Sequence, residues 1–381
     1  MWCRCQDVLV SAPLLIRAGR ALVAGRLQDN VDVLLADGRV SAVGPDLSGP
    51  ASTRVIELPS GVLSPGYVDL HVHALDGCGM VGAASPDVPG LARALAARGV
   101  TGFLATTAAA PITEQFEVLA SLSDGSAGAR CLGVHLEGPW LAPERAGAQP
   151  PDALILPALA DLEQLLQAGP PVMLTLAPEL PGALPVISRA AAAGVVVSLG
   201  HSAASYDQTL AAVAAGARHV THCFNAMAPL HHREPVLVGA ALDLAEVTVE
   251  AIADGVHLHP AIVRLLWRAC GPQRVCLVSD AVDLADVDQA DVAATPTADR
   301  AARLPDGTLA GSRVGLDGCV RNAVAWGIPL ADALTMATTT PAGVLGRSVD
   351  LTPGAVADVV LLDAELRVVM TVVGGTAVWP A

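Results

Sequence analysis

The chain has 381 residues, of which 52% are hydrophobic, and these numbers predict one large domain or a large domain with a small companion. A formal net charge of −15, without a basic cluster, argues against nucleic acid or an anionic membrane as a partner. Gly, Pro or a charge interrupts each apolar run before the ~18 residues that a spanning helix needs, so no membrane segment is expected. Scattered cysteines without a CxxC pair are typical of a reduced, cytoplasmic protein.

The sequence contains no lysine, because all 22 of its basic residues are arginines. Schiff-base catalysis needs a lysine amine and is therefore excluded. A metal bridge derived from a modified lysine is excluded for the same reason, so any bridging ligand must be another type of residue.

Both ends of the chain have the character of β structure. Residues 8–63 contain short β segments broken by turns, among them a hairpin predicted at the Asp-Gly pair of LLADGRV. Residues 357–379 have the same character, with a Gly-Gly turn between two strands. We therefore predict one small β-sandwich domain built from both termini, residues 1–63 and 346–381.

The middle of the chain, residues 64–345, alternates between two kinds of segment. Apolar, β-branched runs occur eight times, near 67–72, 100–106, 131–136, 172–176, 195–199, 219–222, 247–253 and 275–279. Ala- and Leu-rich stretches of helical character lie between most of them. Strands that alternate with helices predict an α/β fold with a parallel sheet, and eight such units predict a closed (β/α)8 TIM-like barrel.

Polar residues fall at the carboxyl ends of these predicted strands, where barrel enzymes place their catalytic groups. The first strand ends in His71 and His73, which are two residues apart and therefore point to the same face. The third, fifth, sixth and eighth strands end, in order, in Glu137, His201, His222 and Asp280. All six side chains are expected to converge on one mouth of the barrel.

This cluster predicts a metal site, because imidazole nitrogen and carboxylate oxygen are ligands that Zn²⁺ and similar divalent ions prefer. His71 and His73 can reach one ion from a single strand face. His201 and His222 can hold a second ion, and Glu137 can serve either or both. A lone histidine is more often a hydrogen-bonded core or loop residue, but five candidate ligands at strand ends of one barrel favour the metal interpretation.

Asp280 has three candidate roles: a sixth ligand, a helix N-cap, or the catalytic acid and base. The cap is common for an aspartate after a strand, but a neighbouring metal cluster favours a role in the site. His135 shares a strand face with Glu137 and is interpreted as a support for the ligands, with a ligand role left open. His231 and His232 are interpreted as loop residues.

Six motifs connect the chain to a known group of enzymes. In chain order they are PGYVDLHVH, GVHLEGPWLAPERAGA, SLGHSAASYDQTLAAVAAGARHVTHCFNAMAPLHHREP, AIADGVHLHP, LVSDA and GTLAGS. With these motifs the chain resembles the amidohydrolase superfamily and, within it, the N-acetylglucosamine-6-phosphate deacetylase family. The combination of HLEGP, LGH, THCFNAM and HHREP is specific, whereas HxH alone indicates only the superfamily.

The resemblance implies a metal-dependent deacetylase with a barrel and a small β domain. It implies Glu137, His201 and His222 as the primary metal ligands and Asp280 as the acid/base. Some family members have the HxH pair and a second metal, and others lack both. This chain has the pair, so one or two divalent ions are expected, with zinc preferred over iron, manganese or cobalt.

The resemblance also implies a substrate site, whose residues would be Ala148, Asn225, Ala226, Arg233, His257 and Leu309. Asn225 and Ala226 would contact the sugar phosphate. Arg233 and His257 would bind it too, by reaching across the interface of a homodimer, and an arginine fork suits phosphate because it donates two parallel hydrogen bonds. Ala148 and the backbone near Leu309 would line the sugar.

Three departures from the family pattern bear on the substrate. The family usually has GAH, but Gln149 stands where that substrate-contacting histidine would be, and glutamine cannot carry charge. REP is usually followed by glycine, but Val236 follows here, and its Cβ is expected to shift the loop that carries Arg233. Residues 281–307 are unusually acidic, which disfavours a phosphate dianion near the mouth.

The implied reaction is metal-dependent hydrolysis of the N-acetyl group of N-acetylglucosamine 6-phosphate, giving glucosamine 6-phosphate and acetate. A deacetylase for a different N-acyl amino sugar or amine is the first alternative, and Gln149 supports it. A deaminase or cyclic-amide hydrolase would share HxH and the strand-end aspartate, but it would not need the HLEGP glutamate or the FNAM segment. A non-catalytic binding protein on the same barrel is disfavoured by the complete set of ligands.

Overall fold

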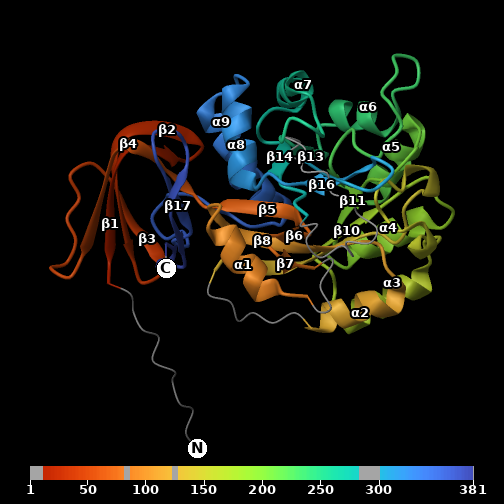
Figure 1. Ribbon diagram of the computed structural model, residues 1–381, viewed down its shortest axis with the longest axis horizontal. Coiled ribbons are helices and arrows are strands. Elements are labelled where there is room, and N and C mark those ends of the chain that lie inside the picture. Colours follow the sequence, from red (N-terminus) through yellow and green to blue (C-terminus); the bar gives the residue numbers. More distant parts are fainter. Residues whose placement is uncertain (1–11, 81–85, 122–127, 283–300, 381) are drawn as a thin grey trace, which may run out of the picture.

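The computed structural model describes residues 12–80, 86–121, 128–282 and 301–380. Within these ranges the chain forms a barrel of strands and helices beside a smaller sheet, which lies on the left of Figure 1. Cys3, Cys5 and most of the acidic segment 281–307 fall outside the described residues, so the expected effect of that segment on phosphate stays a prediction.

Eight parallel strands form the barrel, and each coincides with one of the eight predicted runs. In spatial order, which is also chain order, they are β5 (Tyr67–Val72), β8 (Val100–Thr107), β9 (Arg130–Glu137), β10 (Met173–Leu176), β11 (Val196–Leu199), β12 (His219–Val220), β13 (Thr248–Ile252) and β14 (Val275–Val278). Val72 at the end of β5 pairs in parallel with Ala281, just beyond β14, and this pairing joins the two edge strands. The predicted (β/α)8 barrel is therefore confirmed.

Helices between and after these strands cover the outside of the barrel (Figure 1). They are α1 (Val88–Ala96), α2 (Ile112–Ser121), α3 (Leu159–Ala168), α4 (Ala183–Ala192), α5 (Tyr206–Ala215), α6 (Val236–Asp243), α7 (Pro260–Cys270), α8 (Leu316–Ala325), α9 (Leu330–Ala337) and α10 (Thr339–Val344). Leu91 of α1 and Ile187 of α4 are fully buried in the same apolar core as Phe103 of β8. Burial of apolar helix faces against the strands is the main force that holds these two layers together.

A seven-stranded sheet takes its strands from both ends of the chain. In spatial order they are β19 (Thr376–Trp379), β18 (Val368–Val373), β17 (Val359–Leu362), β4 (Arg54–Pro65), β1 (Leu14–Val23), β2 (Arg26–Ala36) and β3 (Arg39–Gly44). The sheet curls so that its edge strand β3 approaches the segment before β17, where Val40 donates a backbone hydrogen bond of 2.9 Å to Ala355. Ile16, Val33 and Leu361 meet in the apolar core inside it. The predicted β domain from both termini is confirmed, whereas its boundaries at residues 63 and 346 stay predictions.

Both predicted hairpin turns are present in this sheet. Asp37 and Gly38 connect β2 to β3, and Gly374 and Gly375 connect β18 to β19. All four residues have positive φ, which glycine adopts without strain. The two turns also touch, since a Cβ on Gly38 would lie 3.1 Å from the carbonyl oxygen of Gly374.

Short segments at the carboxyl ends of the barrel strands build the mouth. They are β6 (Ala74–Leu75), β7 (Cys78–Gly79), the 3₁₀ turns Pro143–Arg145 and Pro151–Ala153, β15 (Ala301–Arg303) and β16 (Leu309–Ser312).

Two expectations from composition can be compared with the described residues. In the described part of the chain, no helix is long and apolar enough to cross a bilayer. The six cysteines of the described residues form no disulfide.

Side chains alternate along the barrel strands, and near the carboxyl ends the inward face contains polar residues. On β9, Val134 and Leu136 belong to the core shared with the helices. His135 and Glu137 lie on the opposite face, because neighbouring residues of a strand point to opposite sides. Their side chains are nevertheless buried, at 0% and 2% exposure, so the interior of the barrel contains polar groups that need partners.

Candidate active site

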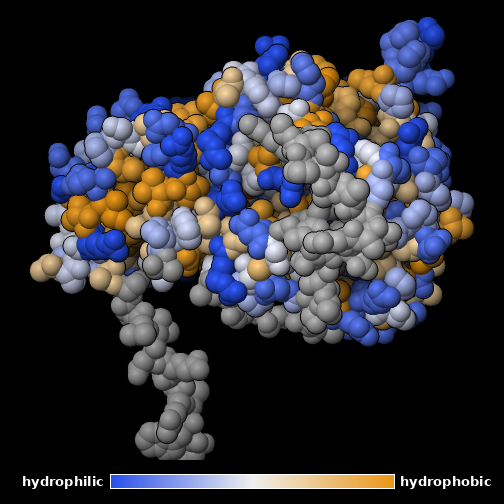
Figure 2. Space-filling view, in the orientation of Figure 1, coloured by the Kyte–Doolittle hydropathy of each residue, from blue (hydrophilic) through white to orange (hydrophobic). Residues whose placement is uncertain are grey.

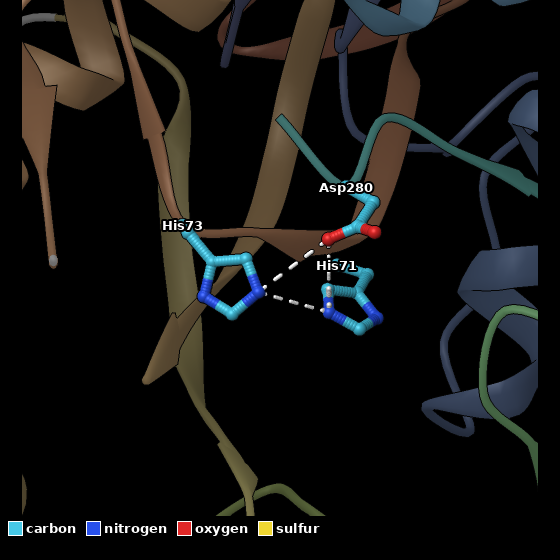
Figure 3. A group of neighbouring side chains, drawn as sticks. All are labelled: His71, His73 and Asp280. Carbon is cyan, nitrogen blue, oxygen red and sulfur yellow. Dashed lines mark hydrogen bonds and ion pairs between the residues drawn. The ribbon is translucent and has the colours of Figure 1, made fainter. Parts of the chain in front are cut away.

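Three residues from the first and last barrel strands form one group at the mouth, which we call the His71 half-site: His71, His73 and Asp280 (Figure 3). The Nε2 atoms of the two histidines lie 3.2 Å apart. Each of them also lies 3.5 Å from Oδ1 of Asp280. Nδ1 of His73 faces the carbonyl oxygen of Thr106 at 3.2 Å. A carbonyl can only accept, so Nδ1 carries a proton, and Nε2 is the nitrogen that a metal ion would bind once its own proton is lost.

Glu137, His201 and His222 form a second group, which we call the His201 half-site. Oε1 of Glu137 lies 3.0 Å from Nε2 of His201 and 2.9 Å from Nε2 of His222, and the two Nε2 atoms are 3.2 Å apart. Nδ1 of His201 faces the carbonyl oxygen of Arg145 at 2.9 Å. Its Nε2 is therefore the nitrogen that faces Glu137 and His222.

Three of these residues have a backbone conformation that is uncommon outside glycine. The φ angles of His201, His222 and Asp280 are 48°, 27° and 47°. A non-glycine residue in this left-handed region costs on the order of 1–3 kcal/mol and persists only where its surroundings fix it. Each of the three lies two residues beyond the end of its strand. The unusual backbone conformation is therefore part of what turns the side chain toward the mouth.

Glu137 lies between the two half-sites. Its Oε1 serves the His201 half-site, whereas its Oε2 lies 3.3 Å from Nε2 of His73 and accepts a 2.6 Å hydrogen bond from Gln149. Burial raises the pKa of Glu137, but the nearby charge of His71 and hydrogen bonds from His201 and His222 outweigh burial and hold the pKa well below its usual range. The carboxylate is therefore ionised and contacts both half-sites.

The residues present fit a divalent metal. Two pairs of imidazole Nε2 atoms lie at 3.2 Å, His71 with His73 and His201 with His222, and each pair lies beside carboxylate oxygens. Ligand atoms of a tetrahedral zinc ion, with bonds of about 2.0–2.1 Å, are separated by about 3.3 Å. Nitrogen and carboxylate donors at this spacing match the ligand preference of zinc and similar ions.

The pKa values of His71 and His73 are shifted by the negative charge of the neighbouring carboxylates. Burial lowers the pKa of His73, but hydrogen bonds to Asp280 and Glu137 outweigh it and raise the pKa to about 9. The pKa of His71 is raised well above its usual value, because Glu137, Glu250 and Asp280 outweigh burial. A metal binds the deprotonated imidazole, so metal binding displaces these protons and is favoured by higher pH.

Buried residues outside the two half-sites hold the ligands in place. Nδ1 of His135 lies 3.1 Å from the carbonyl oxygen of Leu70, and its Nε2 lies 2.7 Å from the hydroxyl of Thr175. Both ring nitrogens of His135 therefore have protein partners, which supports its interpretation as a supporting residue. Burial and the charge of His71 lower the pKa of His135 to about 3, so this ring is neutral. Sequence reasoning missed a further supporting residue, Glu250 on β13, whose carboxylate faces Nδ1 of His71 at 3.0 Å.

A cavity of about 270 Å³ opens over the two half-sites. Five of the six predicted substrate residues line it: Ala148, Asn225, Ala226, His257 and Leu309. Its volume is just below the range of about 300–1,000 Å³ that is typical of small-molecule pockets. Gln149 and Arg303 line it as well, and the sequence had not singled out Arg303 as a substrate residue.

The sixth predicted substrate residue, Arg233, does not line this cavity. It lies in the segment between β12 and α6, which projects from the barrel at the upper right of Figure 1 and is hydrophilic at its tip in Figure 2. Residues 229–234 are exposed, and the guanidinium of Arg233 lies 2.9 Å from Nε2 of His232. Val236, at the start of α6, has a φ of 51°, so the backbone there keeps a conformation that glycine would favour. His231 and His232 lie in a loop, as predicted.

A larger cavity, of about 950 Å³, lies elsewhere. It is lined by Val196 and Thr248, which begin β11 and β13, and by parts of α9 and α10. The amino ends of barrel strands contribute to stability rather than catalysis. None of the residues of the two half-sites lines this cavity, so the chemistry belongs to the smaller one.

Comparison with known proteins agrees with this site. The Amidohydrolase family profile matches residues 62–378. The chain belongs to the amidohydrolase family. An N-acetylgalactosamine-6-phosphate deacetylase from Escherichia coli O157:H7 is 37% identical over 93% of this chain and 96% of its own length. An N-acetylglucosamine-6-phosphate deacetylase from Vibrio furnissii is 35% identical over 93% of this chain and 92% of its own length. The chain is therefore an amidohydrolase enzyme, and its predicted resemblance to these deacetylases is confirmed.

Solved structures show the same relationship. An N-acetyl-D-glucosamine-6-phosphate deacetylase mutant from Mycobacterium smegmatis, in complex with N-acetyl-D-glucosamine-6-phosphate, superposes with a TM-score of 0.87 at 34% identity, covering 97% of this chain and all of that one. An N-acetylglucosamine-6-phosphate deacetylase from Thermotoga maritima has a TM-score of 0.81 at 30% identity, covering 98% of this amidohydrolase and all of that chain. Both pairs match over the barrel and the small β domain together.

Proposed function

We propose that this amidohydrolase hydrolyses the N-acetyl group of N-acetylglucosamine 6-phosphate to glucosamine 6-phosphate and acetate. The observation that carries the proposal is the cavity in which both half-sites and five predicted sugar-binding residues meet. A relative of known structure binds N-acetyl-D-glucosamine-6-phosphate, and that protein matches this chain over nearly its whole length. The deaminase and non-catalytic alternatives gain no support from these comparisons.

The metal ligands in this proposal are the two half-sites. Glu137, His201 and His222 hold the primary ion, His71 and His73 hold a second one, and zinc is preferred over iron, manganese or cobalt. A bound divalent ion polarises an amide carbonyl and lowers the pKa of water toward ~7. Glu137 takes the bridging role that a lysine-derived ligand cannot fill here.

Asp280 transfers the protons in this proposal. Burial raises its pKa, but in the metal-free protein the charge of His71 and the hydrogen bond and charge of His73 outweigh burial and lower it. A bound cation would supply the same positive charge after it displaced those protons, so the carboxylate starts as a base. It accepts the proton of the attacking water and then donates that proton to the leaving amine. Its backbone is fixed on both sides, because its N–H donates to His71 at 2.8 Å and its carbonyl accepts from Ser312 at 2.8 Å.

Gln149 supports the reacting groups. Its Oε1 accepts a 2.7 Å hydrogen bond from the backbone of Ala109, and its Nε2 donates to Glu137 at 2.6 Å. These two contacts fix the orientation of the side-chain amide. Because that amide has two N–H donors, the second one is available to the oxyanion that forms on the acetyl carbonyl.

The test is acetate release from a panel of N-acetylated sugars by the metal-loaded enzyme. The panel contains N-acetylglucosamine with and without the 6-phosphate, and N-acetylgalactosamine 6-phosphate as the epimer. We expect the highest kcat/KM for N-acetylglucosamine 6-phosphate. A higher value for the galacto epimer would move the assignment to the substrate named for the Escherichia coli relative, and a higher value without phosphate would overturn the phosphate assignment.

Replacement of Arg233 by alanine is expected to raise KM for the phosphorylated sugar by about 10–100-fold. A hydrogen bond to a charged group contributes about 1.5–3 kcal/mol, which corresponds to that factor. The unphosphorylated sugar should be affected far less. Equal loss on both substrates would remove the phosphate role of Arg233, and selective loss in Arg303→Ala alone would assign the phosphate to Arg303 instead.

Exchange of subunits tests whether Arg233 acts across a homodimer, as we propose from its position outside its own chain's cavity. Arg233→Ala keeps Asp280, and Asp280→Asn keeps Arg233. Mixed dimers of these two variants would therefore contain one complete site, and activity on the phosphorylated sugar should recover on mixing. No recovery in verified mixed dimers would contradict an Arg233 that serves the partner subunit.

The KM for the phosphorylated sugar is expected to rise with pH. Burial lowers the pKa of His257, but its 2.7 Å hydrogen bond to Asp254 and the charge of Asp280 raise it above the usual value near 6.5. The charged imidazole is present below this raised pKa and is lost as pH increases through it. Steady-state kinetics from about pH 6.5, where the phosphate is already a dianion, to about pH 9 would measure the rise.

Asp254→Asn is the matched control for this pH effect. The asparagine keeps an oxygen for the backbone N–H groups of Val256 and His257, which Oδ1 of Asp254 now accepts. It removes the charge that raises the pKa of His257, so the rise in KM should start at lower pH. A KM that rises equally for the unphosphorylated sugar would contradict the role of His257 in phosphate binding.

A further inference from the structure

Glu250 is a buried carboxylate inside the barrel that the proposed mechanism does not use. It lies in the middle of β13 with 0% exposure, and its strand neighbours Val249 and Ala251 belong to the apolar core. An ionised carboxylate in such a place is destabilising by several kcal/mol unless charged or hydrogen-bonding groups satisfy it. The partners of Glu250 therefore indicate what the residue is for.

One oxygen of Glu250 contacts both half-sites. Its Oε2 lies 3.0 Å from Nδ1 of His71, and it accepts a 2.9 Å hydrogen bond from the backbone N–H of His222. Its other oxygen, Oε1, lies 3.2 Å from Nε2 of His219.

The contact with His71 fixes which ring nitrogen faces the metal. Oε2 of Glu250 accepts the backbone N–H of His222, so this oxygen is an acceptor, and Nδ1 of His71 donates to it. Nε2 is then left to face His73 and Asp280, at 3.2 and 3.5 Å. Such outer partners of a ligating histidine change metal affinity by about 10–100-fold when they are removed.

The contact with His222 acts on the backbone instead of the ring. Nδ1 of His222 is buried and has no hydrogen-bond partner among the described residues, whereas Nδ1 of His71, His73 and His201 each has one. The orientation of the His222 ring therefore depends on its backbone, whose φ of 27° is unusual. Glu250 holds that backbone twice, since its carboxylate accepts from the N–H of His222 and its carbonyl accepts from Cys223 at 3.0 Å.

We propose that Glu250 is a positioning residue that couples the two half-sites, by orienting the ring of His71 and the backbone of His222 with one carboxylate oxygen. The inference rests on the metal ligands of the proposed function. Removal of the carboxylate should weaken metal binding at both half-sites, and binding at one half-site should stabilise the arrangement that the other one needs. His219 supports Glu250 from behind, because its other nitrogen is held at 2.6 Å by Thr248.

Metal titration of the full chain, stripped with a chelator, tests the proposal. Zn²⁺ competition against a chromophoric chelator gives the affinity, and the visible spectrum of bound Co²⁺ reports the ligand arrangement. Glu250→Ala is expected to lose about 10–100-fold in affinity at each half-site. Glu250→Gln should lose less than about tenfold, because an amide oxygen can still accept from His71 and His222.

Thr371→Val is the control, since it removes a buried hydroxyl at a distance from the ligands. Its hydroxyl donates to the carbonyl oxygen of Ala96 at 2.7 Å and contacts no residue of either half-site. The variant is expected to lose stability without a change in metal affinity or in the Co²⁺ spectrum. If Glu250→Ala does not fold, Glu250→Asp replaces it, because the shorter side chain withdraws the oxygen and keeps the charge.

The His73→Ala background separates the two half-sites. It removes a ligand of the His71 half-site, so the remaining affinity belongs to Glu137, His201 and His222. Adding Glu250→Ala in this background should still lower affinity, because the backbone of His222 is released. Unchanged affinity there would overturn the coupling, as would an equal effect of Thr371→Val. A wild-type chain that binds no divalent ion would instead refute the proposed function itself.

Discussion

Asp280→Asn is expected to lower kcat by about 10²–10⁴, the usual contribution of general acid and base catalysis, while the enzyme keeps its metal. The asparagine has nearly the same shape but can neither accept the proton of water nor donate one to the amine. Its backbone contacts to His71 and Ser312 do not involve the side chain, so the fold should persist. Metal analysis and acetate release, measured on the same preparation, check both parts.

The structure makes this experiment decisive, because Asp280 also satisfies the geometry of a ligand. Its Oδ1 is 3.5 Å from Nε2 of both His71 and His73, so it could complete the His71 half-site. A ligand role predicts that Asp280→Asn loses metal, and the assignment as acid and base would then be wrong. Asp317→Asn is a suitable control, because Asp317 is a buried aspartate of α8 that pairs with Arg321 at 2.8 Å, outside both half-sites.

The barrel could be predicted from sequence because its signals are local. Each strand is an apolar run such as GVVVSL or RVCLV, followed by a helical stretch. The period of two then assigns one face of each strand to the barrel interior. His71 and His73 satisfy that period, and Glu137 follows the same face as His135. Histidine and carboxylate side chains at the strand ends, where barrels place their active sites, were sufficient to predict the residues of the two half-sites from the sequence.

Glu250 was not predicted, although its signal is visible in the sequence. It is a single acidic residue in an apolar run, VTVEAIA, and a charge in the middle of a buried strand needs a partner. Its partner His71 is 179 positions away, so no local pattern could identify which charge it serves. Whether the side chain of Glu250 points to solvent or into the barrel interior depends on the register of β13. Only the assembled barrel defines that register.

Arginines of the substrate site were hard to place for a different reason. Arg233 and Arg303 lie next to irregular segments, where no periodicity determines the direction of a side chain. The structure places Arg303 at the cavity and Arg233 on the projecting segment. A contact that forms only between two subunits leaves no pattern in the sequence of one chain, so the role of Arg233 depends on the subunit-exchange experiment.

Glu137→Gln is expected to lower metal affinity at both half-sites by more than the 10–100-fold typical of outer partners, and to lower kcat/KM by about 10³-fold or more. Glutamine keeps the length and shape of the side chain, but its amide nitrogen cannot be a ligand. Whichever way the amide turns, one half-site faces an N–H group: either His201 and His222 near Oε1, or His73 near Oε2. The negative charge between the two half-sites is also lost.

Gln149→Ala separates the charge of Glu137 from the support that holds it. This variant removes the 2.6 Å hydrogen bond to Oε2 but leaves the carboxylate and the histidines in place. Its metal affinity should fall by less than tenfold. Zinc content and acetate release, measured for both variants, give the comparison. If Glu137→Gln bound metal like wild type while Gln149→Ala did not, the carboxylate would not be a ligand.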